Sequence, residues 1–266
     1  MKIAAIQMVS TPEVARNLAA ARRLIAQAAD GGAALVALPE YFCLMGLRDA
    51  DKLGVAELPG DGPIQALLAA AAREFSLWVV GGTLPLRIAG DPGRVRNACC
   101  VFAPDGSLAA RYDKIHLFGF DNGAERYDES LVLEAGSEPV ALDLAPAGLR
   151  LGLSVCYDLR FPELYRALAA DLIAVPSAFT HTTGKAHWEL LLRARAIENQ
   201  AYVIAPAQGG KHENGRRTWG HSMIVDPWGE VLACIETGEG VALAELRPER
   251  IAEVRRQLPA LAHRRL

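Results

Sequence analysis

Short apolar runs alternate with alanine-rich stretches in the first part of the chain. Strands of a sheet that is covered on both faces read as apolar runs, whereas alanine-rich stretches favour helices. The pattern predicts helices at residues 13–29 and 63–75, and strands at residues 2–9, 34–39, 77–84 and 97–102. Strands and helices that alternate in this way are typical of a mostly parallel sheet.

The same order of elements begins again near residue 149. Here the pattern predicts helices at residues 163–170 and 186–200, and strands at residues 149–155, 171–175, 201–206 and 221–225. The halves also share letters, since Leu-Val-Ala-Leu-Pro-Glu at 35–40 resembles Leu-Ile-Ala-Val-Pro-Ser at 172–177. We interpret the chain as a duplicated β-α-β-α-β-β unit, in which Pro-x-Gly turns join the last two strands.

Two such units can bury their bare sheet faces against each other. The expected fold is therefore a four-layer α-β-β-α sandwich of two six-stranded sheets, formed by a single domain over residues 1–266. A single doubly wound sheet is the alternative architecture. With 51% hydrophobic and 22% charged residues, the chain can build a large core without a metal ion or a disulfide.

Charge and cysteine content narrow the class of partner. The formal net charge of −3, without a basic stretch interleaved with aromatic residues, gives no case for nucleic-acid binding. The apolar opening at residues 3–6 is too short to span a membrane, and no targeting segment is recognisable. The five cysteines form no Cys-x-x-Cys pair, which is typical of the reduced cytoplasm. The expected partners are small molecules or proteins.

Two reactive side chains, Cys156 and Glu40, directly follow predicted strands. Ligands of such sheets bind beyond the carboxyl ends of the strands. Cys156 lies where a strand turns into a helix, and the N–H groups of a helix start stabilise a thiolate. Glu40 follows apolar residues, so burial should raise its pKa, as in a general base. Taken singly, a buried core cysteine and a helix-capping glutamate are the ordinary interpretations.

Lys114 adds a cation after the hairpin of the first unit. An ammonium beside a thiol lowers the pKa of the thiol and can stabilise an oxyanion. His116 offers a competing scheme, in which a cysteine–histidine pair acts as in thiol proteases. No third residue that would orient His116 is obvious, so Glu40 and Lys114 are the favoured partners of the thiol.

Three ordered segments carry a resemblance to a known family: Leu38-Pro-Glu40, Tyr112-Asp-Lys114-Ile-His-Leu-Phe and Ser154-Val-Cys156-Tyr-Asp-Leu-Arg-Phe-Pro-Glu163. They resemble the signature segments of the nitrilase, or carbon–nitrogen hydrolase, superfamily, and the resemblance extends over essentially the whole chain. It implies an α-β-β-α sandwich that forms a homodimer or a higher homo-oligomer, with sheets that continue across two subunits. It implies no metal and no organic cofactor.

The resemblance also implies roles for four residues. Glu40 is expected to be the base, Lys114 the oxyanion stabiliser and Cys156 the nucleophile. The N–H of Tyr157 is expected to be a second donor to the oxyanion.

A second active-site glutamate is implied between the lysine and the cysteine. Glu129 matches its position, and Glu125 and Glu134 match it less well. The spacings of the histidines place no two of them on adjacent turns of one helix with a carboxylate, so no metal site is expected at His181, His187, His212 or His221.

Later segments narrow the resemblance to one branch. Thr182-Thr-Gly-Lys-Ala-His-Trp-Glu189 is similar to small ω-amidases, and Ala207-Gln-Gly-Gly210 is most similar to deaminated glutathione amidases. The implied reaction hydrolyses deaminated glutathione, a small-molecule amide that bears a 2-oxo acid, to 2-oxoglutarate and Cys-Gly through a thioester. The alternatives are an ω-amidase acting on 2-oxoglutaramate, another small amide or nitrile hydrolase, and a non-catalytic binding module.

Arg160 is expected to clamp the carboxylate of the 2-oxo acid, with an ion pair to Glu163 as its alternative role. The other residues expected to contact the substrate are Tyr41, Tyr157, Phe179 and Thr183. The polar segment 211–217 is interpreted as a mobile surface loop that can border the pocket and contact the Cys-Gly half of the substrate.

Overall fold

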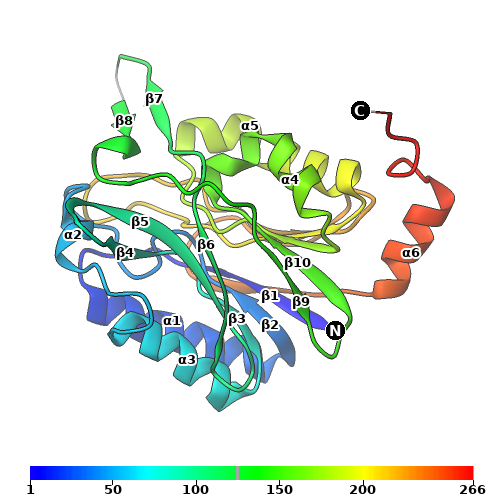
Figure 1. Ribbon diagram of the computed structural model, residues 1–266, viewed down its shortest axis with the longest axis horizontal. Helices are drawn as coiled ribbons and strands as arrows, with labels where there is room; N and C mark the ends of the chain where they lie inside the picture. Colours follow the sequence, from blue (N-terminus) through cyan, green and yellow to red (C-terminus); the bar gives the residue numbers. More distant parts are fainter. Residues whose placement is uncertain (124–125, 266) are drawn as a thin grey trace.

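Two β-sheets lie face to face in the computed structural model, which describes residues 1–123 and 126–265, and helices cover their outer faces (Figure 1). The layers are helix, sheet, sheet and helix. The predicted four-layer α-β-β-α sandwich is confirmed, and the alternative of a single doubly wound sheet is wrong.

The first sheet has seven strands within the described residues. They are β1 (Lys2–Gln7), β2 (Ala33–Ala37), β3 (Trp78–Val80), β4 (Leu84–Ile88), β5 (Asp91–Phe102), β6 (Leu108–Asp113) and β15 (Gly240–Glu245). The order is β15-β1-β2-β3-β5-β4, and β6 pairs with β5. β1, β2 and β3 are parallel, and the C-terminal strand β15 pairs antiparallel with β1.

The second sheet has six strands in the part of the chain that the structure describes, in the order β14-β13-β12-β11-β10-β9. They are β9 (Ala141–Leu144), β10 (Leu149–Leu153), β11 (Leu172–Ala174), β12 (Tyr202–Ala205), β13 (Ser222–Val225) and β14 (Val231–Ile235). β10, β11 and β12 are parallel, and β13 and β14 follow as antiparallel neighbours. This repeats the sequence of pairings in the first sheet, so the internal duplication is visible in the topology.

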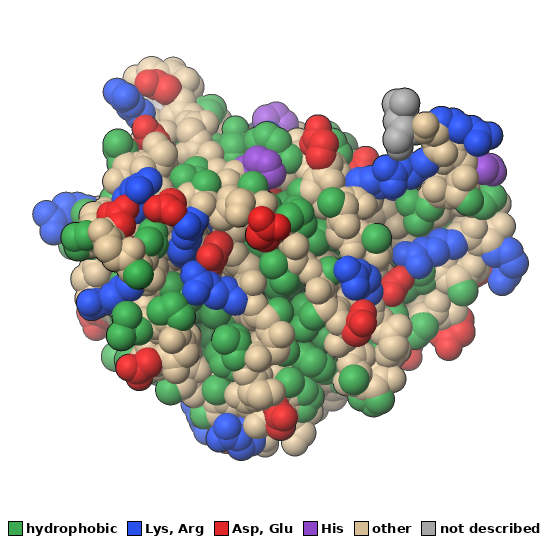
Figure 2. Space-filling model, in the orientation of Figure 1, with side chains coloured by type: hydrophobic (Ala, Val, Ile, Leu, Met, Phe, Trp, Pro, Cys, Tyr) green, Lys and Arg blue, Asp and Glu red, His purple; other side chains and the backbone are tan. Residues whose placement is uncertain are grey.

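Helices α1 (Val14–Asp30) and α3 (Pro63–Phe75) cover the first sheet, whereas α4 (Pro162–Leu168) and α5 (His181–Asn199) cover the second (Figure 1). The remaining elements are short or peripheral: α2 (Asp51–Gly54), α6 (Pro248–Gln257), the 3₁₀ helices η1 (Glu129–Leu131) and η2 (Cys156–Arg160), and the hairpin of β7 (Gly119–Asp121) and β8 (Arg126–Asp128). This hairpin projects from the body of the molecule (Figures 1 and 2).

The alternation of side chains along β1 explains how one strand serves two cores. Ile3 and Ala5 belong to the core between the sheets, whereas Ala4 and Ile6 belong to the core beneath α1 and α3. Successive side chains of a strand point to opposite faces, so a strand covered on both sides must be apolar at every position. All four side chains are fully buried.

Among the element boundaries that differ from the sequence prediction, two concern elements near the site. The strand expected at 77–84 is divided into β3 and β4 by a bend at Gly81 and Gly82, which adds a strand to the first sheet. Helix α5 starts at His181 instead of residue 186, because the Thr180 hydroxyl caps it by accepting a hydrogen bond from the Thr183 N–H at 3.2 Å.

Candidate active site

Glu40 lies in the turn after β2 and is 1% exposed. Its Oε1 accepts hydrogen bonds from Lys114 Nζ and from Asn97 Nδ2, each at 2.9 Å. Its Oε2 accepts a hydrogen bond from the Ala178 N–H at 3.0 Å. Because Ala178 lies beyond β11, the carboxylate joins a loop of the first sheet to a loop of the second.

A close backbone contact fixes the turn that carries Glu40. Gly82 has φ +56°, and a Cβ there would lie 2.2 Å from the carbonyl oxygen of Pro39. The hydroxyl oxygen of the following residue, Thr83, accepts a hydrogen bond from the Tyr41 N–H at 2.9 Å. Tyr41 itself has φ 58°, a conformation that residues other than glycine seldom adopt. The bend between β3 and β4 therefore sets the direction of the Glu40 side chain.

Lys114 lies directly after β6 and has a fully buried side chain. Its ammonium bridges two carboxylates, at 2.9 Å from Glu40 Oε1 and 2.7 Å from Glu129 Oε2. Glu129 also accepts hydrogen bonds from the Tyr41 hydroxyl at 2.7 Å and from the Phe118 N–H at 2.8 Å. The buried cation therefore has a fixed position between the two acids.

Of the glutamates considered as the second acid, the structure brings Glu129 to the site. Glu134 lies elsewhere and pairs with Arg94 and Arg96. Glu125 lies outside the described residues.

Cys156 follows β10 and opens η2, with φ +49° and 8% exposure. Its N–H donates to the Pro176 carbonyl at 2.9 Å, which holds the turn in this strained conformation. The thiol interacts with the Glu40 carboxylate and with the Ala178 N–H. The expected turn from strand to helix is present, but η2 intervenes and α4 begins only at Pro162.

Burial dominates the acid–base properties of Cys156 and Glu40. The pKa of Glu40 is raised above its ordinary value by burial, which outweighs the lowering by Lys114. The pKa of Cys156 is raised well above its ordinary value by burial and by the charge of Glu40. Lys114 acts to lower the pKa of this thiol, as expected, but its effect is smaller and the net shift is upward. The resting thiol is protonated and lies beside a proton acceptor.

The other two charged groups behave differently. Burial acts to raise the pKa of Glu129, but the Lys114 ammonium outweighs it and the net shift is downward. Burial likewise acts to lower the pKa of Lys114, but the charges of Glu129 and Glu40 raise it well above its ordinary value. Lys114 and Glu129 therefore stay charged while Glu40 is free to exchange a proton.

Asp158 organises the turn behind the thiol. Its carboxylate accepts hydrogen bonds from the Val155 N–H at 2.8 Å and from the Tyr112 hydroxyl at 2.7 Å, and it lies 2.7 Å from His116 Nδ1. The sequence-based view that His116 has no orienting residue is therefore wrong. His116 stacks on Phe161 at 3.7 Å between ring centres and does not line the pocket, so it is oriented away from the thiol chemistry.

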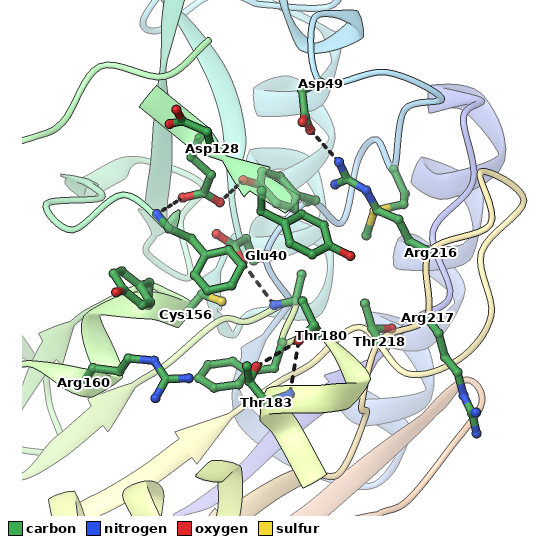
Figure 3. Close-up of a pocket in the computed structure, with 18 residues that line it drawn as sticks. Glu40, Asp49, Asp128, Cys156, Arg160, Thr180, Thr183, Arg216, Arg217 and Thr218 are labelled. Carbon is green, nitrogen blue, oxygen red and sulfur yellow. Dashed lines mark hydrogen bonds and ion pairs between the residues drawn. The ribbon is translucent and has the colours of Figure 1, made fainter. Parts of the chain in front are cut away.

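One pocket opens beside Cys156 (Figure 3), and it is lined by all five residues expected to contact the substrate: Tyr41, Tyr157, Arg160, Phe179 and Thr183. The Arg160 guanidinium lies 5.7 Å from the Tyr157 ring centre and 5.6 Å from that of Phe179. Among the described residues Arg160 forms no ion pair with Glu163, so its alternative role is not found. Thr183 Oγ1 lies 2.9 Å from Thr180 Oγ1, so the α5 cap forms part of the wall.

Sequence reasoning missed residues that only the folding of distant loops brings to the site. Asn97, on β5, bonds to Glu40 without a motif to mark it. The pocket wall also contains Met45, Asp49, Phe118, Tyr127, Asp128, Ala178, Thr180, Arg216, Arg217 and Thr218. The segment 211–217 borders the pocket as expected, but its interpretation as a surface loop is wrong for His212, which is 3% exposed.

The described residues contain no group of three or more His, Cys, Asp and Glu side chains that could hold a metal ion. None of the helices in residues 1–123 and 126–265 combines the length and the apolar character needed to cross a membrane.

Comparisons with known proteins agree with this geometry. The sequence model of the family described as Carbon-nitrogen hydrolase matches residues 2–256. The chain is 44% identical to the deaminated glutathione amidase of Synechocystis sp. over 265 residues, which is 98% of this chain and 97% of that protein. It is 38% identical to the omega-amidase NIT2-A of Xenopus laevis over 268 residues, 99% of this chain and 95% of that protein.

The crystal structure of the NitFhit protein of C. elegans matches this fold with a TM-score of 0.92 at 39% identity. The match covers 99% of this chain and 65% of that chain, so this chain spans just under two thirds of its length.

Proposed function

This chain belongs to the carbon–nitrogen hydrolase family and is a hydrolase of amides, and from this premise we propose that it cleaves deaminated glutathione to 2-oxoglutarate and Cys-Gly. The observation that carries the proposal is the buried network of Glu40, Lys114 and Cys156, which opens on a pocket with Arg160 in its wall. The similarity to a deaminated glutathione amidase supports the choice of substrate.

In the proposed acylation step, Glu40 takes the proton of the Cys156 thiol and the sulfur attacks the amide carbonyl carbon. The oxyanion that forms accepts hydrogen bonds from the Lys114 ammonium and the Tyr157 N–H. The carbon–nitrogen bond then breaks, and Glu40 gives its proton to the departing amine. The raised pKa of Glu40 suits a group that must both take and return a proton near neutral pH.

In the proposed deacylation step, Glu40 removes a proton from water, and the resulting hydroxide attacks the thioester carbonyl carbon. The carbon–sulfur bond breaks, the acid is released, and Glu40 returns the proton to the Cys156 sulfur. Glu129 does not exchange protons in this scheme, because its pKa is lowered. Its role is to hold Lys114 in place through the 2.7 Å ion pair.

Arg160 is proposed to bind the carboxylate of the 2-oxo acid. Within the described residues it has no acidic partner, and its guanidinium is held by the rings of Tyr157 and Phe179 on the pocket wall. A planar guanidinium binds a carboxylate through two parallel hydrogen bonds, which would fix the acyl group relative to the thiol.

The second candidate is an ω-amidase that hydrolyses 2-oxoglutaramate to 2-oxoglutarate and ammonia. The similarity to the Xenopus omega-amidase favours it, and the acyl group that the site must bind is the same. A non-catalytic binding module would have no use for the bonded network of Glu40, Lys114, Glu129 and Cys156.

The test compares the release of 2-oxoglutarate from deaminated glutathione and from 2-oxoglutaramate. We expect deaminated glutathione to be the better substrate and Cys156→Ala to lower kcat by about 10³-fold or more, because the thioester can no longer form. Cys234→Ala, at a cysteine outside the pocket, is the matched control and should keep full activity. Activity that survives Cys156→Ala would overturn the mechanism, and a strong preference for 2-oxoglutaramate would overturn the choice of substrate.

We further propose that the protein works in the cytoplasm as a homodimer or a higher homo-oligomer. All five cysteines are free thiols, which a reducing compartment preserves. Large apolar side chains are exposed on the outer face of α5 and in the adjoining turn, at Leu190, Ile197 and Trp228, where a second copy would cover them.

A further inference from the structure

The pocket has a cation on each of two sides. Arg160 lies on one side of Cys156, whereas Arg216 and Arg217 lie on the other (Figure 3). Arg160 is accounted for by the 2-oxo acid, but neither of the other two arginines has a part in the mechanism above. We call Arg216 and Arg217 the arginine edge.

The arginine edge is carried by an anchored hairpin. Lys211 and Arg217 pair across it, and the His212 N–H donates to the Arg216 carbonyl at 2.9 Å. The His212 ring is buried, with Nδ1 2.9 Å from the Ser10 carbonyl and Nε2 2.8 Å from Thr218 Oγ1. This core contact fixes the backbone of the hairpin beside the pocket.

The Arg217 backbone is also held from the helix side of the pocket. Its carbonyl accepts a hydrogen bond from the His181 N–H at 3.0 Å, at the first residue of α5. Thr180, which caps the same helix, pairs with Thr218. The edge is therefore tied to the wall that carries Phe179.

The charges of the edge are only partly neutralised. Arg216 donates to Asp49 at 2.8 Å and lies over the Tyr127 ring at 5.5 Å. Asp49 is shared with Lys52 at 3.1 Å, so one carboxylate faces two cations. Arg217 is exposed and has no acidic partner in residues 1–123 and 126–265.

Neither the acid of the hairpin nor Asp128 of the pocket wall forms an ion pair with Arg217 in the part of the chain that the structure describes. Glu213, the acid of the hairpin itself, pairs with Arg16 at 3.0 Å. Asp128 also lines the pocket, where its Oδ1 accepts hydrogen bonds from the Ser130 N–H and hydroxyl, and it forms no ion pair with Arg217. Arg217 therefore keeps a guanidinium on the pocket wall that no carboxylate of the described residues pairs with.

We propose that Arg217, supported by Arg216, binds the carboxylate of the departing amine, which in the proposed substrate is the C-terminal carboxylate of Cys-Gly. This inference rests on the proposed function. With the 2-oxo acid at Arg160 and the scissile amide at Cys156, two extended residues carry that carboxylate about 7 Å away from the amide. Arg217 lines the pocket on the side opposite Arg160, and its exposed side chain points away from Cys156 (Figure 3). In the proposal it turns toward the carboxylate when the substrate binds.

The inference makes Arg217 a specificity residue. The ammonia released from 2-oxoglutaramate has no carboxylate, so that substrate gains nothing from the arginine edge. Deaminated glutathione gains a charge-assisted hydrogen bond, which favours it over the smaller amide.

The test measures kcat and KM for Arg217→Gln, Arg217→Lys and wild type on three substrates: deaminated glutathione, the same molecule with its glycine carboxylate converted to a carboxamide, and 2-oxoglutaramate. We expect Arg217→Gln to raise KM for deaminated glutathione, lowering kcat/KM by about tenfold, and Arg217→Lys to keep most of the activity. On the carboxamide and on 2-oxoglutaramate both variants should stay within about twofold of wild type. Lys211→Gln removes the same charge from an exposed position outside the pocket and is the matched control.

The outcomes separate this inference from the function on which it rests. The inference alone is overturned if wild type hydrolyses deaminated glutathione and Arg217→Gln changes kcat/KM by the same factor, or not at all, on all three substrates. The inference is also overturned if Lys211→Gln lowers kcat/KM for deaminated glutathione as much as Arg217→Gln does, since the effect is then one of general charge. Wild type that does not hydrolyse deaminated glutathione overturns the choice of substrate and the inference together.

Discussion

In the proposed mechanism Glu40 takes up and returns the proton of the Cys156 thiol, and its surroundings explain why it can. Three donors contact its carboxylate, yet burial still raises its pKa. The same burial, together with the charge of Glu40, keeps the Cys156 thiol protonated in the resting enzyme. In the proposed mechanism the thiolate is therefore formed by proton transfer from Cys156 to Glu40, instead of existing as a stable thiolate.

The pH dependence of kcat/KM tests this assignment. A carboxylate base works only when deprotonated, so kcat/KM should rise with pH along an acid limb. The midpoint of this limb should lie above the ordinary glutamate pKa of 4.5, because burial raises the pKa of Glu40. Glu40→Gln should remove this limb and lower kcat/KM by about 10²-fold or more. His116→Ala should keep the acid limb and lower kcat/KM by less than about tenfold.

If His116→Ala removed the limb and were as damaging as Glu40→Gln, the cysteine–histidine scheme would be correct in spite of the contact between His116 and Asp158.

At the scale of the elements, the site depends on turns that place side chains beyond strand ends. Tyr41 and Cys156 both have positive φ, although neither is glycine. Such conformations persist only where the surroundings enforce them. For Tyr41 the surroundings are Thr83 and Gly82 in the bend between β3 and β4, which explains why that bend interrupts a predicted strand.

Gly82→Ala should therefore be strongly destabilising. A Cβ at Gly82 would meet the Pro39 carbonyl oxygen at 2.2 Å, in addition to the strain of φ +56°. Gly90→Ala is the matched control, because Gly90 has φ +80° but nothing within 4 Å of its Cβ position. In denaturant unfolding, Gly90→Ala should lower the free energy of unfolding by about 1 kcal/mol, and Gly82→Ala should lower it by about 1–3 kcal/mol more. Equal costs would mean that the contact with Pro39 does not support the turn.

At the scale of the whole molecule, the site belongs to neither sheet alone. Glu40 and Lys114 follow strands of the first sheet, whereas Cys156 and Ala178 follow strands of the second. The hydrogen bond from Ala178 to Glu40 crosses between the two halves. A change in how the sheets pack would therefore alter the distance between base and nucleophile.

The proposed homodimer predicts a property of the intact protein. Leu190 and Ile197 lie seven residues apart on α5, so they share one face, and they are 68% and 48% exposed. Wild type should show twice the chain mass in size exclusion with light scattering, and the variant with Leu190→Glu and Ile197→Glu should be monomeric. Leu108→Glu, at a residue 47% exposed on β6, is the control and should leave the mass unchanged. A monomeric wild type, or a dimer that survives both changes on α5, would contradict the proposed interface.

The sequence by itself determined the layers of the fold and indicated the residues of the proposed catalytic network. Apolar runs and amphipathic stretches record which faces are buried, since burial of those faces drives folding, and the duplication made the second half readable from the first. The motifs around Glu40, Lys114 and Cys156 are local in the chain, so they could be read without knowing what they contact. Glu129 was identified in the same way.

Only the tertiary structure decided what lies against these residues. Asn97 on Glu40, Asp158 on His116, and Arg216 and Arg217 across the pocket are contacts between segments far apart in the chain, and no periodicity records them. The pKa shift of Cys156 has the same origin, because burial and the charge of Glu40 arise only when two sheets close on each other. Patterns of apolar and polar side chains encode which surfaces are buried. The electrostatic field at a reactive atom depends instead on every group that folding brings near it.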